Sequence, residues 1–104
     1  MVTLGDAEVD RALAAAGLRW ERRDGALVRQ WRGPDFAAAL AHVVRIGVLA
    51  EAAGHHPDID IRWNTLTLRL VTHSAGGITE QDLALAAAID ALDLEPGAGV
   101  AGGS

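Results

Sequence analysis

The stretch EAAGHHPDIDIRWNTLTLRLVTH, residues 51–73, decides the fold, because it holds a helix end, two candidate strands and three of the four histidines. Gly54 predicts the end of the helix, since glycine enters the left-handed conformation there without steric cost. Pro57 has no N–H and pushes His56 into extended backbone geometry. His55 and His56 are therefore expected at a helix-to-strand corner.

Apolar and polar residues alternate over 58–63 and again over 65–72. This period is typical of strands with one buried face, and the two stretches together predict a β-hairpin. Trp63 belongs to the apolar set of the first stretch. We expect its indole to pack rather than to bind a ligand.

The turn of this hairpin, centred near Asn64 and Thr65, sets which histidines meet. Opposed residues then have numbers that sum to about 129, so His56 faces His73 across the open end. A register shifted by one or two residues would bring His55 opposite His73 instead.

Glu51 lies four residues before His55, on the same face of the helix, where a carboxylate favours a protonated imidazole. One acid and three histidines would thus gather at one end of the hairpin, a composition that suits proton transfer near neutral pH. Two other interpretations remain. Each histidine alone could be an ordinary surface residue, and the group could bind zinc. Because His55 and His56 in extended geometry point to opposite faces, we predict no metal site.

Turn-forming and helix-capping residues divide the rest of the chain into secondary-structure elements. Gly17 ends a short amphipathic helix, and Asp24-Gly25 is a strong two-residue turn signal between strands. Asp35 predicts the start of the central helix. Thr79 and Asp82 have the spacing of a capping box, which opens the last helix.

The central helix has a broad apolar face, which we expect to lie against the sheet. Gly47 within it suggests a close approach to a neighbouring element, and His42 is interpreted as a packing or interface residue. The face is formed by Phe36, Leu40, Val43, Val44, Gly47 and Val48.

These elements predict an α+β fold, a four-stranded antiparallel sheet with three helices packed on one face, in the order α-ββ-α-ββ-α. A chain of 104 residues suits one domain, placed at residues 1–94. The glycine-rich stretch 95–104 is expected to be a disordered tail.

Composition excludes several classes of function. The net charge is −5 and no basic stripe is present, so we expect no nucleic-acid partner. The absence of cysteine excludes disulfides and thiolate ligands. The N-terminus lacks the basic residues of a signal peptide, and no uninterrupted apolar run approaches about 18 residues. We therefore expect a soluble cytoplasmic protein without a membrane partner.

An acidic residue, three intervening residues, His-His-Pro, a later aromatic residue and Thr-His resemble the pterin-4a-carbinolamine dehydratase family. The likeness runs from about Leu13 to Ala91 and so covers nearly the whole chain. The matching residues are Glu51, His55, His56, Pro57, Trp63, Asn64, Thr72 and His73.

The resemblance implies the dehydration of a 4a-hydroxytetrahydropterin to quinonoid dihydropterin and water, in tetrahydrobiopterin recycling, by an enzyme that needs no cofactor. It further implies self-association into dimers or tetramers. Animal relatives also act as dimerisation cofactors of a transcription factor, using a helix face. A non-catalytic interaction protein of the same fold is therefore the alternative function, and a member that has lost turnover is a third interpretation.

The resemblance also implies roles for the residues at matching positions. His55 and His73 are expected to transfer protons, with His55 tuned by Glu51, while His56 holds the hydroxyl-bearing side of the ring. Main-chain groups of Gly54, Thr72 and Ser74 would bind the amide edge of the pterin. Asp82 would contact substrate besides capping the last helix. The expected substrate-binding residues are Gly54, Pro57, Thr72, Ser74, Asp82 and Trp20.

Overall fold

Turn residues separate the elements much as the sequence predicts. The computed structural model describes residues 2–93, so the tail expected over 95–104 lies outside the described residues. Within them the predicted order of helices and hairpins is confirmed. The elements are α1 (Asp6–Ala16), β1 (Glu21–Arg23), β2 (Ala26–Arg32), α2 (Phe36–Ala53), β3 (Asp58–Arg62), β4 (Thr65–Leu70), the 3₁₀ turn η1 (His73–Ala75) and α3 (Glu80–Leu92).

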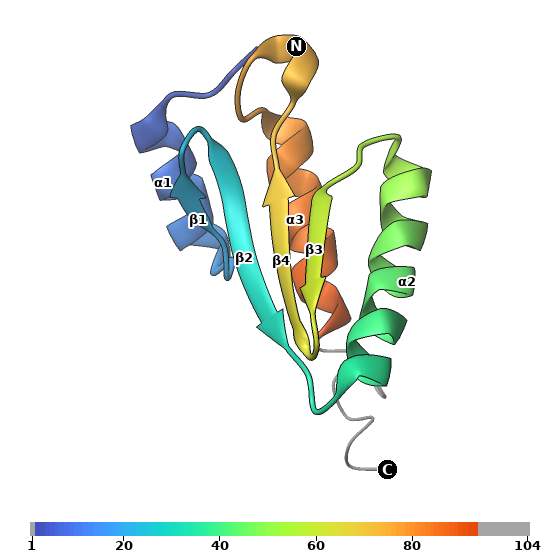
Figure 1. Cartoon of the computed structure of the whole chain (residues 1–104). Helices are drawn as coiled ribbons and strands as arrows, with labels where there is room; N and C mark the ends of the chain where they lie inside the picture. Colours follow the sequence, from blue (N-terminus) through green and yellow to red (C-terminus); the bar gives the residue numbers. More distant parts are fainter. Residues whose placement is uncertain (1, 94–104) are drawn as a thin grey trace.

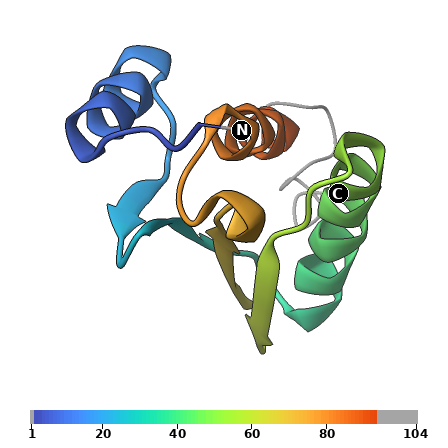
Figure 2. The ribbon, with the colours of Figure 1, turned by 90° about the horizontal axis from the view of Figure 1, so that it is seen from above.

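The two hairpins join into one four-stranded antiparallel sheet with the strand order β1-β2-β4-β3. The helices α1, α3 and α2 form a row over one face of this sheet, and the other face is uncovered (Figures 1 and 2). A sheet that is apolar on one side requires such a layer. The predicted α+β fold is therefore confirmed.

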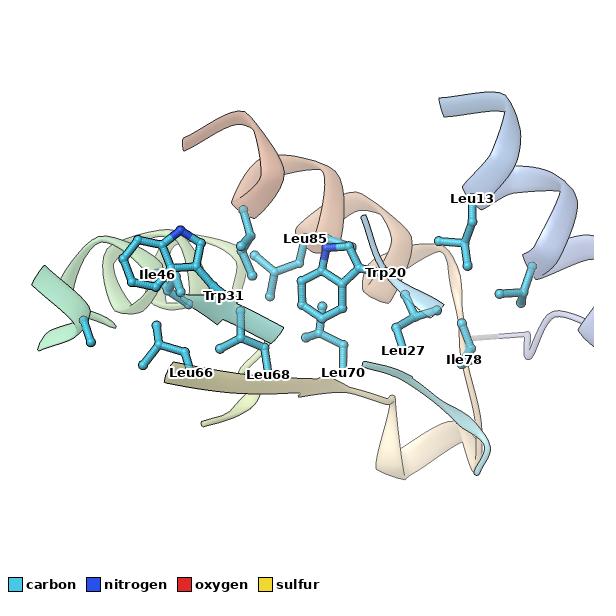
Figure 3. Close-up of a cluster of buried hydrophobic side chains, with 14 residues drawn as sticks. Leu13, Trp20, Leu27, Trp31, Ile46, Leu66, Leu68, Leu70, Ile78 and Leu85 are labelled. Atoms are coloured by element: carbon cyan, nitrogen blue, oxygen red, sulfur yellow. The ribbon is translucent and has the colours of Figure 1, made fainter. Parts of the chain in front are cut away.

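The core lies between the central strands and the helices (Figure 3). Strand β4 contributes Leu66, Leu68 and Leu70, which are completely buried. Leu27 of β2 and Ile46 of α2 pack into the same cluster. Truncation of such a side chain to alanine typically costs about 2–5 kcal/mol of stability, so β4 is the strand on which the helical layer depends.

The first hairpin has the turn that Asp24-Gly25 predicts. Both residues have positive φ angles, 50° and 75°, as a tight turn between twisted strands requires. Asp35 caps α2 as predicted, since its side chain accepts a hydrogen bond from the N–H of Ala38 at 2.8 Å.

The second hairpin turns one position earlier than expected. Arg62 pairs with Thr65, so the turn consists of Trp63 and Asn64. The Asn64 amide donates to the carbonyl of Gly33 at 2.8 Å and ties this turn to the chain that enters α2. Trp63 therefore occupies the first turn position, with φ +50°, and is 69% exposed, so the predicted packing of its indole is wrong.

Helix α2 turns a different face to the core than the predicted one, although Val43 of the predicted face does pack against the core. Its buried residues are Ala39, His42, Ile46 and Ala50, two alanines and two larger side chains. The expected packing role of His42 is confirmed. The exposed side carries an apolar stripe at intervals of four, which we term the α2 ridge: Phe36, Leu40, Val44 and Val48.

Two further expectations about α2 change. A Cβ atom at Gly47 would meet nothing within 4 Å, so the predicted close approach is wrong. By length and composition α2 could cross a membrane, with a mean hydropathy of 1.6, although no uninterrupted apolar run marks it in the sequence. It packs against α3, β3 and β4 in the structure, and core helices of soluble proteins meet the same two criteria.

Candidate active site

The corner between α2 and β3 is built by Gly54. Its φ of 62° ends the helix, and the N–H of His55 reaches back to the carbonyl of Ala50 at 3.2 Å. This left-handed cap turns the chain sharply toward β3. His55 and His56 consequently leave the helix at the end of the sheet where β3 begins (Figure 1).

The end of β4 supplies the third histidine. Thr72 forms an isolated bridge with Gly77, and its carbonyl accepts hydrogen bonds from the N–H groups of Ala75 and Gly76. These bonds close a tight loop that contains η1. His73 is the first residue of η1 and is exposed.

A cavity of about 410 Å³ joins the two segments. All three histidines line it, although the predicted direct opposition of His56 and His73 is wrong, because the earlier turn shifts the register. The volume falls within the usual range for small-molecule sites. The lining residues are Gly54, His55, His56, Val71, Thr72, His73, Ser74 and Gln81.

His55 has a carboxylate partner, but that partner is Asp82 instead of Glu51. The Nε2 atom of His55 donates to Oδ1 of Asp82 at 2.5 Å. Asp82 is completely buried, and 11% of the His55 side chain is exposed. A buried acid thus fixes the orientation of an imidazole at the cavity wall.

Asp82 is held by the start of α3. Its Oδ2 atom accepts hydrogen bonds from the N–H of Thr79 at 2.9 Å and from the hydroxyl of Thr72 at 2.8 Å. The capping box predicted for Thr79 and Asp82 is confirmed. The N-terminus of a helix favours a negative charge, so this position suits an ionised carboxylate.

Glu51 pairs with the other histidine of the corner. Its Oε2 atom accepts from Nε2 of His56 at 2.7 Å, and both side chains are well exposed. The expected tuning of His55 by Glu51 is therefore wrong. Gly54 ends α2 just before His55, so the helical i to i+4 geometry does not reach that residue.

The structure separates other predicted residues from the cavity. Trp20 is buried in the core, and its Nε1 atom donates to Asp90 of α3 at 2.8 Å, so it does not stack on a ligand in the histidine cavity. Pro57 shapes the corner but is absent from the cavity lining. The main-chain N–H of Thr72 donates to Gly77. Its carbonyl also accepts hydrogen bonds within the loop, so both main-chain groups of Thr72 have partners there, and its contact with a ligand stays a prediction.

Val71 and Gln81 also line the cavity, although the sequence pattern does not predict them as site residues. No motif marks Val71 as a site residue, and Gln81 follows the N-cap Thr79 in the first turn of α3. Within residues 2–93, no group of three or more histidine, cysteine and acidic side chains is arranged to hold a metal ion. Two further cavities, of about 420 and 490 Å³, have no histidine in their lining.

The fold and the cavity define a small α+β protein with an acid-supported histidine site. The family model for pterin 4 alpha carbinolamine dehydratase matches residues 2–92. The chain belongs to this family.

Relatives of known sequence support the assignment. A protein of Mycobacterium sp. (strain KMS) is 53% identical over 92 residues, which are 88% of this chain and 97% of that protein. One of Chloroflexus aurantiacus (strain ATCC 29366 / DSM 635 / J-10-fl) is 51% identical over 92 residues, 88% of this chain and 98% of the relative. Both carry the provisional name of a pterin-4-alpha-carbinolamine dehydratase.

Solved structures share the fold. A transcriptional coactivator/pterin dehydratase from Brucella melitensis is 32% identical, with a TM-score of 0.79 over 86% of this chain and 96% of that one. A pterin dehydratase-like protein described as a RuBisCO assembly factor in the alpha-carboxysome is 24% identical, with a TM-score of 0.57 over 71% and 86% of the two chains. The second likeness concerns the fold alone.

Proposed function

We propose that the protein dehydrates a 4a-hydroxytetrahydropterin to quinonoid dihydropterin and water, within tetrahydrobiopterin recycling. The observation that carries this proposal is the cavity lined by His55, His56 and His73, in which a buried carboxylate orients one imidazole. Membership of the dehydratase family supports the reaction class.

The reaction needs two proton transfers. The bond between carbon 4a and the hydroxyl oxygen breaks, and the hydroxyl group takes up a proton to leave as water. The N–H bond of the adjacent ring nitrogen breaks as well, and its electron pair forms the new carbon–nitrogen double bond. Positioned acids and bases typically contribute about 10²–10⁴-fold to such a step.

His55 is the proposed base. Because its Nε2 donates to Asp82, Nδ1 carries the lone pair that can accept the ring proton. Asp82 also stabilises the imidazolium that forms, as a buried carboxylate does in a catalytic triad. This role depends on a contact between residues 27 positions apart in the sequence.

His73 is the proposed acid for the leaving hydroxyl, because it is exposed at the opposite segment of the cavity. His56, paired with Glu51, holds the hydroxyl-bearing side of the ring. Gly54 and Ser74 remain candidates for the amide edge of the pterin. Gln81 joins them, since its side-chain amide both donates and accepts hydrogen bonds.

The test is a dehydration assay on purified protein, followed by loss of the 4a-hydroxypterin absorbance against the spontaneous rate. We expect His55→Ala and His73→Ala each to lower kcat by about 10²-fold or more. His42→Phe is the matched control, because this fourth histidine lies outside the cavity and should leave kcat unchanged. Full activity of both alanine variants would refute the assignment.

We also propose that the protein self-associates through the α2 ridge, as a dimer or a tetramer. Val44 and Val48 are 67% and 65% exposed in the single chain, and such a continuous apolar stripe on a helix is typical of a protein interface. A second copy presents the same stripe, so two ridges can bury each other.

The same ridge favours the second candidate function, a coactivator-type interaction protein. The Brucella melitensis structure bears both descriptions, coactivator and dehydratase. This function would use α2 and leave the histidine cavity free. It predicts that variants of the ridge lose a partner protein while their dehydratase activity stays intact.

A further inference from the structure

A chain of hydrogen bonds leads from the start of α3 to His55. The hydroxyl of Thr79 accepts from the N–H of Gln81 at 3.2 Å and lies 2.8 Å from the hydroxyl of Thr72. Thr72 Oγ1 lies 2.8 Å from Oδ2 of Asp82, whose Oδ1 faces His55 at 2.5 Å. Thr72, Thr79 and Asp82 are all buried.

The position of every proton in this chain follows by elimination. A carboxylate can only accept, so the hydroxyl of Thr72 donates to Asp82. Because that hydroxyl has a single proton, the contact between the two threonines requires Thr79 to donate to Thr72. At the other oxygen of Asp82, His55 must donate from Nε2. All bonds of the chain therefore point toward the carboxylate.

This direction assigns a tautomer to the neutral imidazole. With the proton of His55 on Nε2, the lone pair is on Nδ1. Hydrogen bonds in such a chain polarise one another, so each threonine hydroxyl strengthens the anchoring of Asp82. If the Asp82 carboxylate rotated, it would be a poorer acceptor for Nε2–H of His55. The Nε2–H tautomer would then no longer be favoured.

We propose that Thr72 is a positioning residue whose hydroxyl orients Asp82 and thereby holds neutral His55 in the Nε2–H tautomer. Thr72 is suited to this role because its main-chain groups are used within the loop at Gly77 and its side chain is buried. Its hydroxyl is the one group of this residue that reaches the acid.

The tautomer is measured by ¹⁵N NMR of the histidine side chains in the full chain, at a pH where the spectra themselves show neutral imidazoles. We expect the Nε2–H form of His55 in the wild type and in Thr72→Ser, which keeps the hydroxyl. Thr72→Val has the shape of threonine without the hydroxyl and should show a mixture of the two tautomers. Amide spectra that match the wild type confirm that each variant is folded.

Two results would overturn the proposal. One is an Nδ1–H tautomer of His55 in the wild type, a measurement that depends on no variant. The other is an unchanged Nε2–H population in folded Thr72→Val or, if that variant does not fold, in the smaller Thr72→Ala.

A kinetic consequence rests on the proposed function, whereas the tautomer does not. We expect Thr72→Val to lower kcat about tenfold with little change in KM, and Thr72→Ser to restore kcat. If the wild type showed no dehydratase activity while the tautomers behaved as expected, the proposed function would fail and the role of Thr72 would stand.

Discussion

His42 shows what burial does to a single histidine. Its ring stacks on Trp31 with the centroids 4.3 Å apart. Within residues 2–93 neither ring nitrogen has a hydrogen-bond partner, and Nε2 lies 3.7 Å from Oδ1 of Asp93. Burial lowers the pKa of His42, Asp93 opposes this effect, and the charges of Arg29 and Arg45 add to it. His42 is therefore neutral in the folded protein at neutral pH.

This lowered pKa predicts a loss of stability in acid. The unfolded chain protonates His42 below about pH 6.5, while the folded chain resists protonation until a lower pH. The contribution of His42 to the free energy of unfolding is fully present above about pH 6.5. Below this pH it falls by at most about 1.4 kcal/mol per pH unit. His42→Phe keeps a ring against Trp31 and should flatten this part of the stability profile.

The measurement compares the free energy of unfolding of both proteins between about pH 7.5 and about pH 5.5. Every other titrating group is common to the two chains and cancels in the difference. Parallel profiles would contradict the prediction.

The sequence predicts the members of the histidine site better than their pairing. His55, His56 and His73 are recognisable because Gly54 and Pro57 fix the backbone locally. The partner of His55 is not, since Asp82 arrives from α3 and its approach depends on how that helix packs. Spacing within one helix favours Glu51, but α2 ends at Ala53 before it reaches His55, and Glu51 pairs with His56 instead.

At the scale of elements, two glycines of helical segments should respond to alanine in opposite ways. Gly47 lies within α2 with open space around it, so Gly47→Ala should raise the free energy of unfolding by about 0.5–1 kcal/mol. Gly17 caps α1 with φ 63°, where a Cβ atom is strained, so Gly17→Ala should lower it by about 1 kcal/mol.

Chemical denaturation of the two single variants beside the wild type checks both signs. The substitution is the same in each case, so the contrast isolates the backbone conformation. Destabilisation by Gly47→Ala would mean that a neighbour absent from the single chain occupies the space beside α2.

The elements themselves follow from the sequence, but their orientation does so only in part. The spacing of apolar residues predicts α2 and its capping residues predict its ends. The spacing fails to predict the buried face, because α2 carries apolar residues on both sides, and Ala39, Ile46 and Ala50 face the core. The larger valines of the α2 ridge gave the stronger but misleading signal.

For the whole molecule, the α2 ridge predicts how copies associate. The wild type should have the mass of a dimer or tetramer in light scattering after gel filtration. Val44→Asp places a charge at the middle of the ridge and should give the mass of a single chain. Ala14→Asp, at an exposed position of α1, is the matched control and should leave the assembly intact.

A wild type that remains a single chain at high concentration would exclude self-association through the ridge. An oligomer that survives Val44→Asp would move the interface elsewhere on the molecule.

The most direct test of the proposed activity's location is a crystal structure with an unreactive dihydropterin bound. We predict the ring in the cavity of about 410 Å³, in contact with His55, His56 and His73. Within that site, Nδ1 of His55 should face the ring while Nε2 stays on Asp82. A pterin bound on the uncovered face of the sheet, or a histidine cavity left empty at saturating ligand, would contradict the account.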